Sequence, residues 1–175
     1  SAIVVMETLR RARARGARIY AEVLGAGSAS DDPARPLSGL GISMRRALTE
    51  SGLLASDIDF ISAHGPSDQD IDRWEVEHIR EVFGSAADRL SVTSIKGVTG
   101  NPLSAGGPMQ VVAGALSFER GWLPPIANYE CPDPTCNLPF IVGPPRRAAV
   151  RHMLINAHGM GNVNAALVLA APSIR

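Results

Sequence analysis

The stretch Phe60-Ile61-Ser62-Ala63-His64-Gly65 decides the fold, because an apolar run ends there in a histidine and a glycine. Two later stretches, 91–97 and 153–159, also run from apolar residues into a polar residue followed by a glycine. Each pattern predicts a buried strand whose tip presents a polar side chain where backbone can approach a ligand closely. Three such tips predict one site built from several strand ends, which is typical of α/β enzymes.

The composition predicts one globular domain with a sizeable core. The chain has 175 residues, of which 45% are hydrophobic and 19% are charged. Its 17 Lys+Arg balance its 17 Asp+Glu, so no basic field favours nucleic acid or an anionic membrane. No apolar run reaches membrane-spanning length. We therefore expect no nucleic-acid partner and no membrane partner.

The cysteines and histidines argue against a disulfide framework and against a metal site. Cys131 and Cys136 are too few for a disulfide framework, which favours a reduced, cytoplasmic compartment. No second Cys/His pair with metal spacing accompanies them, so we expect no metal site. Of the histidines outside the first strand tip, we expect His152 and His158 to be structural or at the surface, and His78 to be solvated on a helix.

The hydrophobic periodicity alternates between strand and helix. Strands are predicted at 2–7, 19–27, 58–63, 90–95, 140–142, 151–156 and 164–170. Helices are predicted at 9–15, 39–51, 70–83 and 103–120, with a loop over 28–38. This order predicts α/β layers, with the last two strands forming a hairpin on a mixed sheet. The apolar start reads as a core strand with nothing before it, which favours a fragment or one half of a two-chain protein.

The stretch around the second strand tip supports a functional role for His64 at the first strand tip. It places Lys96 at a strand end, a polar residue between Gly100 and Pro102, and then a helix whose first turns are small residues. A histidine at a strand end is by itself more often structural than catalytic. A lysine in this unusual setting indicates that His64 and Lys96 share a site.

In order and spacing, these motifs resemble the C-terminal part of β-ketoacyl synthases, closest to the condensing enzymes of type II polyketide and fatty-acid synthesis. The resemblance covers essentially the whole chain, residues 1–175. Its motifs are Ile61-Ser62-Ala63-His64-Gly65 with Asp72 and Glu75; Ser94-Ile95-Lys96 with Thr99-Gly100-Asn101; residues 123–138; and residues 156–164. It implies a thiolase-like fold, a five-layered αβαβα arrangement of two α/β halves. This chain would supply the second half and the last strands of the first.

The resemblance implies decarboxylative Claisen condensation of acyl and malonyl thioesters. His64 would be a histidine whose Nε2–H donates to the thioester oxygen, where negative charge grows. Lys96 would orient a partner and set the local field, and Glu75 would be the buried acid linked to it. The backbone N–H of Met160, beside Gly161, would be an oxyanion donor, with the Met160 side chain as a gate over the acyl pocket.

The departures from the family pattern matter as much. The nucleophilic cysteine of the family lies in an N-terminal half that this sequence lacks, and its second histidine is replaced by Asn101. Two threonines that bind the pantetheine arm in relatives are Pro66 and Asp68 here. The residues assigned to the carrier arm are therefore Ser67 and Asp68.

The implied partners are a separate N-terminal half carrying the cysteine, a second ketosynthase or chain-length-factor unit that completes a dimer, and an acyl carrier protein. No cofactor is implied beyond the phosphopantetheine that the carrier delivers. The main alternative is a non-catalytic subunit, like the chain-length factors, that shapes the acyl tunnel of an active partner. His64 and Lys96 favour activity, whereas Asn101 and the lost threonines favour degeneracy. A Ser-His-acid hydrolase is a weaker alternative, because no Gly-x-Ser-x-Gly elbow occurs.

Overall fold

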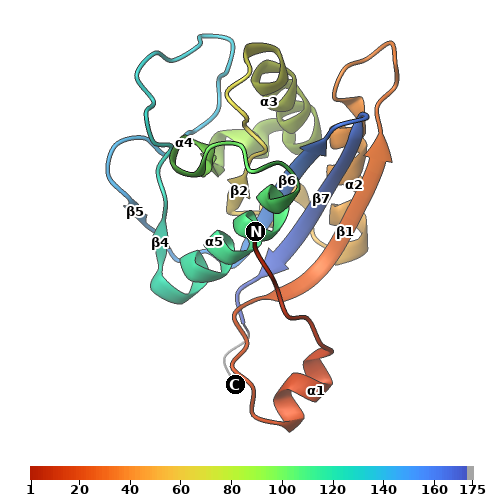
Figure 1. Cartoon of the computed structure of the whole chain (residues 1–175), viewed down its shortest axis with the longest axis vertical. Helices are drawn as coiled ribbons and strands as arrows, with labels where there is room; N and C mark the ends of the chain where they lie inside the picture. Colours follow the sequence, from red (N-terminus) through yellow and green to blue (C-terminus); the bar gives the residue numbers. More distant parts are fainter. Residues whose placement is uncertain (173–175) are drawn as a thin grey trace.

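The computed structural model describes residues 1–172, which form two helical layers around a mixed sheet (Figure 1). In chain order the helices and strands are α1 (Leu9–Ala14), β1 (Glu22–Ser30), α2 (Ser38–Ser51), β2 (Phe60–Ser62), α3 (Gln69–Phe83), β3 (Ser91–Thr93), α4 (Lys96–Thr99), α5 (Gly106–Arg120), β4 (Trp122–Leu123), β5 (Arg146–Arg147), β6 (His152–Gly159) and β7 (Val163–Ala170). Three short 3₁₀ turns lie between them, at Ala55–Asp57, Gly84–Arg89 and Leu103–Ala105.

The main sheet has the strand order β1-β7-β6-β2-β3. Strands β6, β2 and β3 run parallel, whereas β7 is antiparallel to both of its neighbours, β6 and β1. The β6–β7 pair is the hairpin that the sequence predicts. Because β2, β3 and β6 are parallel, their carboxyl ends meet at one edge of the sheet, which brings the three predicted strand tips together.

Each face of the sheet has its own core, as the alternation along β6 requires. Leu154 packs with α2 and α3 on one face, whereas Met153 and Ile155 pack with Val111 and Phe118 of α5 on the other. In Figure 1, α5 lies in front of the sheet and α2 behind it. The sequence-predicted α/β layering is therefore present, with three layers in this chain.

Helix α2 lies unusually close to strand β1, and glycine makes this approach feasible. A Cβ built on Gly27 would lie 2.2 Å from the carbonyl oxygen of Ser43, and one on Gly25 would lie 2.4 Å from that of Ala47. Any larger residue at these positions would push the helix away from the sheet. These contacts hold the middle and the C-terminal part of α2 against β1.

Two predicted strands are wrong. Residues 2–7 form no strand, and the side chains of Ile3 and Val5 are each 88% exposed, because no neighbouring strand among residues 1–172 pairs with them. Residues 140–142 contribute only a single parallel bridge between Phe140 and Val92. In addition, β1 continues to Ser30, three residues into the predicted loop, because it pairs along the full length of β7.

Among the helices of residues 1–172, none combines the length and apolar character that crossing a membrane requires.

Candidate functional site

The site is centred on His64, two residues beyond the end of β2. Its side chain is buried, with 8% of the residue exposed. The backbone N–H groups of His64 and Gly65 both donate to the carboxylate of Glu75, at 2.8 Å each. This pair of hydrogen bonds ties the tip of β2 to helix α3, so the histidine is held by a buried acid instead of lying on a free loop.

Glu75 is only 2% exposed, and its carboxylate accepts hydrogen bonds from groups on neighbouring parts of the fold. Besides the two backbone donors, its Oε1 accepts from Nδ2 of Asn156 on β6 at 2.9 Å. A buried carboxylate requires such partners. The predicted link to Lys96 is electrostatic: the Glu75 carboxylate opposes the loss of charge at Lys96, while its hydrogen bonds go to backbone and Asn156.

The Nδ1 atom of His64 faces two donors. The backbone N–H of His158 lies 3.2 Å away, and Nζ of Lys96 lies 3.3 Å away. Nζ also contacts the carbonyl oxygen of His64. Because Nδ1 accepts, the ring hydrogen of the neutral imidazole belongs on Nε2. The environment therefore selects the tautomer whose Nε2–H can donate to a substrate.

The electrostatics also keep this imidazole neutral. Burial, with smaller contributions from the charges of Lys96 and His158, lowers the pKa of His64 to about 3. Burial also lowers the pKa of Lys96, although the carboxylates of Glu75 and Asp72 counteract this effect. At neutral pH, His64 is thus an uncharged hydrogen-bond donor and not an imidazolium.

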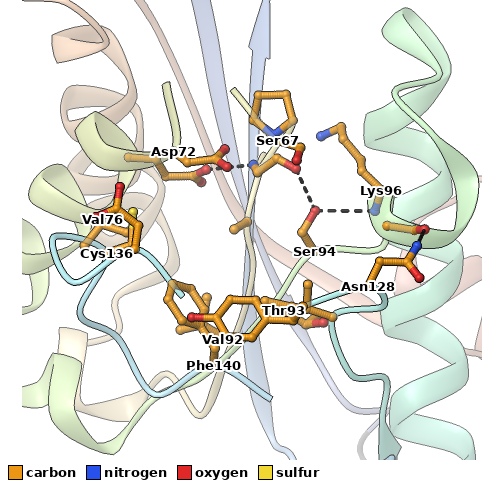
Figure 2. Close-up of a pocket in the computed structure, with 18 of the residues that line it drawn as sticks. Ser67, Asp72, Val76, Val92, Thr93, Ser94, Lys96, Asn128, Cys136 and Phe140 are labelled. Carbon is orange, nitrogen blue, oxygen red and sulfur yellow. Dashed lines mark hydrogen bonds between the residues drawn. The ribbon is translucent and has the colours of Figure 1, made fainter. Parts of the chain in front are cut away.

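A cavity of about 660 Å³ lies beside this histidine, against its neighbours Ala63 and Gly65. Its lining combines the ends of β2 and β3 with α3, α4 and the segment 126–140 (Figure 2). Two buried oxygen atoms among its lining residues, Oδ1 of Asp72 and Oγ1 of Thr93, have no hydrogen-bond partner within residues 1–172. The cavity is therefore a polar, concave space at the carboxyl edge of the sheet, where α/β proteins bind ligands.

Asp72 is the strongly shifted acid of this cavity. Burial, followed by the charge of Glu75, raises its pKa to about 6, although the backbone N–H of Ser67 donates to it and opposes the rise. Figure 2 shows Ser67 and Asp72 joined on one side of the cavity and Lys96 on the other. A carboxyl group with such a pKa exchanges its proton near neutral pH.

Some of the predicted site residues line the cavity, and others do not. Lys96, Ser67 and Asn101 line the cavity. Asp68 does not line it; its carboxylate caps helix α3 by accepting from the backbone N–H groups of Asp70 and Ile71 at 3.1 and 3.0 Å. The Asn101 side chain is exposed, and its Oδ1 accepts from the backbone N–H of Leu103 at 3.3 Å.

The predicted oxyanion turn lies at the tip of the β6–β7 hairpin. Met160 is 92% exposed, and Gly161 follows it with a φ of +85°. Neither residue lines the cavity. Their roles as oxyanion donor and gate remain predictions. Among residues 1–172, no group of three or more His, Cys, Asp or Glu side chains is placed to hold a metal ion.

Sequence reasoning missed two members of the site and misplaced one histidine. Asn156 and His158 contact Glu75 and His64, but each lies more than 80 residues along the chain from its partner, so only the sheet topology reveals the contacts. His78 is not solvated as expected. It is 3% exposed, and its ring lies between Glu81 and the carbonyl of Pro36, because α3 packs that face against the loop before α2.

The comparisons with known proteins identify the family. The family model described as the β-ketoacyl synthase C-terminal domain matches residues 20–130, more than half of the 175 residues. The chain belongs to this family. A relative named putative polyketide β-ketoacyl synthase 1, from Streptomyces halstedii, is 38% identical over 99% of this chain and 42% of its own length. The resemblance inferred from the motifs is therefore confirmed.

Solved structures place the fold. "The ishigamide ketosynthase/chain length factor" matches with a TM-score of 0.90 and 33% identity over 95% of this chain and 42% of its own. A "type II PKS acyl-carrier protein in complex with its ketosynthase bound to the hexaketide" matches with a TM-score of 0.89 and 30% identity, with the same coverage. The thiolase-like ketosynthase fold is confirmed. The chain spans about two-fifths of the length of the relatives it matches.

Proposed function

We propose that this chain supplies the histidine–lysine part of a condensing site that joins acyl and malonyl thioesters in polyketide or fatty-acid synthesis. The observation that carries the proposal is the state of His64. It is buried and neutral, and its Nδ1 is turned toward the backbone N–H of His158 and Nζ of Lys96. An imidazole held in this way presents Nε2–H as a fixed donor, which is the group that a developing enolate requires.

In the proposed reaction, the bond between the malonyl carboxylate and its methylene carbon breaks, and carbon dioxide leaves. The electron pair moves into the thioester carbonyl to form an enolate, whose oxygen accepts from Nε2–H of His64. The enolate carbon then attacks the acyl thioester carbonyl, and a cysteine thiolate is the leaving group. Lys96, at hydrogen-bond distance from Nδ1, keeps the imidazole oriented throughout.

The remaining parts of the proposed site come from outside this chain. The cysteine would belong to an N-terminal half, and a second ketosynthase or chain-length-factor unit would complete the dimer. An acyl carrier protein would deliver both substrates on its phosphopantetheine arm, with no further cofactor. The named structural relatives support these kinds of partner, since one pairs a ketosynthase with a chain length factor and another holds an acyl-carrier protein.

A second candidate is a non-catalytic subunit that shapes the acyl tunnel of an active partner. The state of Asn101 favours it, because this residue is exposed and its side-chain oxygen caps a local turn at Leu103. Such a subunit would assemble with its partner but would need no donor imidazole. The two candidates therefore differ in whether His64 affects turnover.

The test uses the full-length protein, or the complex with the polypeptide that carries the cysteine. Acyl loading on the cysteine and formation of the condensed product are measured separately by mass spectrometry of the protein and the carrier. We expect His64→Ala to reduce condensation by about 10²- to 10³-fold while loading stays close to the unmodified rate, because one transition-state donor is lost. The matched control is His152→Phe, a histidine on β6 whose ring, within residues 1–172, hydrogen-bonds only to the backbone carbonyl of Asp57.

Unchanged product formation in His64→Ala would refute the catalytic role. A stable assembly that neither loads nor condenses would support the tunnel-shaping subunit instead.

A further inference from the structure

The imidazole of His158 lies against that of His64, and a hydrogen bond to Asn164 holds the His158 ring on its other side. The rings of His64 and His158 meet edge to face, with centroids 5.6 Å apart and an interplanar angle of 80°. The backbone N–H of the same His158 donates to Nδ1 of His64. One residue therefore contacts the imidazole of His64 both through its backbone and through its ring.

The ring of His158 has a defined partner of its own. Its Nδ1 lies 2.9 Å from Oδ1 of Asn164, a residue of β7 that is fully buried. The orientation of the Asn164 amide is fixed, because its Nδ2 faces only acceptors: Oδ1 of Asp31 at 2.7 Å, with the carbonyls of Ala29 and Asn162 at 3.4 Å each. Oδ1 of Asn164 must therefore accept, and Nδ1 of His158 must carry the hydrogen.

The other nitrogen of His158 is open. No hydrogen bond to Nε2 is recorded within residues 1–172, and Nε2 is not one of the buried atoms that lack a partner. It therefore reaches solvent-accessible space. The two imidazoles thus have opposite tautomers, with hydrogen on Nε2 in His64 and on Nδ1 in His158.

The chain of contacts ends in a carboxylate away from the cavity. Asp31 follows β1, and its Oδ1 accepts both from Nδ2 of Asn164 and from the backbone N–H of Gly39 at the start of α2. An acid–amide–imidazole series of this kind fixes a ring in one orientation and one tautomer, as the outer hydrogen-bond partners of metal-binding histidines do. Asp31, Asn164 and His158 link the N-terminal end of α2 to the condensing imidazole.

We propose that His158 is a positioning residue for His64: Asn164, itself held by Asp31, fixes the ring of His158, and His158 in turn holds the His64 imidazole as an Nε2–H donor. The inference rests on the proposed function of His64. It assigns to His158 more than the structural or surface role that the sequence indicates.

The test measures condensation in the full-length protein or complex. His158→Phe keeps an aromatic ring against His64 and the backbone N–H, but it cannot donate to Asn164. We expect kcat to fall about tenfold, the effect of one buried hydrogen bond, with KM for the malonyl carrier and the rate of acyl loading unchanged. His158→Asn restores a donor near the position of Nδ1, so we expect it to recover most of kcat. His152→Phe is the matched control on the same strand.

A double-mutant cycle tests the chain of contacts directly. Asp31→Asn keeps an acceptor oxygen but removes the charge, and we expect a smaller fall in kcat than His158→Phe causes. In the His158→Phe background it should have no further effect, because the connection is already broken; independent effects would multiply and would overturn the proposal.

Two other outcomes would also overturn it: full activity of His158→Phe, or an equal loss of loading and condensation. If His64→Ala abolishes condensation while His158→Phe leaves it intact, the positioning role fails and the proposed function stands. If His64→Ala has no effect, the proposed function fails, and the positioning role fails with it.

Discussion

The inner end of the site and its rim are built in different ways. At the inner end, His64, Glu75 and Asn156 are each less than 9% exposed and are joined by hydrogen bonds from three different elements. At the rim, Ser67 and Asn101 are exposed, and within residues 1–172 the Asn101 side chain accepts a single hydrogen bond, from the backbone N–H of its near neighbour Leu103. One part of the site is fixed by tertiary structure and the other by local turns.

This difference separates the groups whose geometry is determined by the fold of residues 1–172 from the groups that this fold leaves open to solvent. The inner groups pair mainly with one another, because an unpaired polar group inside a protein is costly; the exception is Oδ1 of Asn156, which has no partner within residues 1–172. Their geometry is therefore set within residues 1–172. The rim groups have water as an alternative partner, so their arrangement is less strictly set by the fold of residues 1–172. Changes at the inner end should consequently cost more stability than changes at the rim.

The largest expected effect on stability is that of Glu75→Ala. It would leave the N–H groups of His64 and Gly65 and the amide of Asn156 without their acceptor. At about 1–3 kcal/mol for each unsatisfied donor, we expect a loss of at least about 3 kcal/mol in the free energy of unfolding. Chemical denaturation of the full-length protein measures it. Glu75→Gln retains one acceptor oxygen and should lose clearly less; equal losses would contradict this account of Glu75.

The next largest effect is a pH dependence of the unfolding free energy that Asp72 causes. This residue lies between the inner end and the rim. Its pKa is raised to about 6 in the folded protein, so the folded state holds a proton that the unfolded state releases near pH 4. This group therefore lowers stability as the pH rises from about 4 to about 6. In thermal denaturation, Asp72→Asn should gain Tm over the unmodified protein across this window, and the gain should level off above it.

The matched control is Asp70→Asn, an exposed aspartate two residues earlier on the same helix. It should show no such growing difference between pH 4 and 6. A Tm difference for Asp72→Asn that stays constant with pH would contradict the raised pKa.

The smallest expected effect is at the rim. Asp68 accepts from two backbone N–H groups in the first turn of α3, and replacing an N-cap aspartate by alanine costs about 1 kcal/mol. We expect Asp68→Ala to lower the unfolding free energy by that amount, and Asp68→Ser, which also caps, to lower it less. A loss as large as that of Glu75→Ala would remove the contrast between the two regions.

Much of the inner end could be predicted from the sequence because strand tips leave a local pattern. The alternation of strands and helices, the β6–β7 hairpin, and His64 and Lys96 at one edge of the sheet all follow from apolar runs ending at a polar residue and glycine. The contacts of Asn156 and His158 could not be predicted, because they depend on which strands pair and in which register. The parallel β2–β6 pairing, Phe60 opposite Met153, sets that register.

The wrong strand at residues 2–7 has a different cause. An apolar run predicts burial only if a partner surface exists, and no strand within residues 1–172 receives this segment. His78 shows the opposite case. The sequence predicts a solvated side chain, but a loop near Pro36, far away in the sequence, buries it. Composition and periodicity are properties of a segment alone, whereas the burial of its side chains depends on the elements that pack against it.

The most direct test of the central claim is the decarboxylation of malonyl carrier protein, a half-reaction that isolates the donor role of His64. In the full-length protein or complex, release of carbon dioxide is measured for the unmodified protein, His64→Ala and the control His152→Phe. The donor role predicts a fall of about 10²- to 10³-fold for His64→Ala and none for the control. Decarboxylation by His64→Ala at the unmodified rate would contradict it.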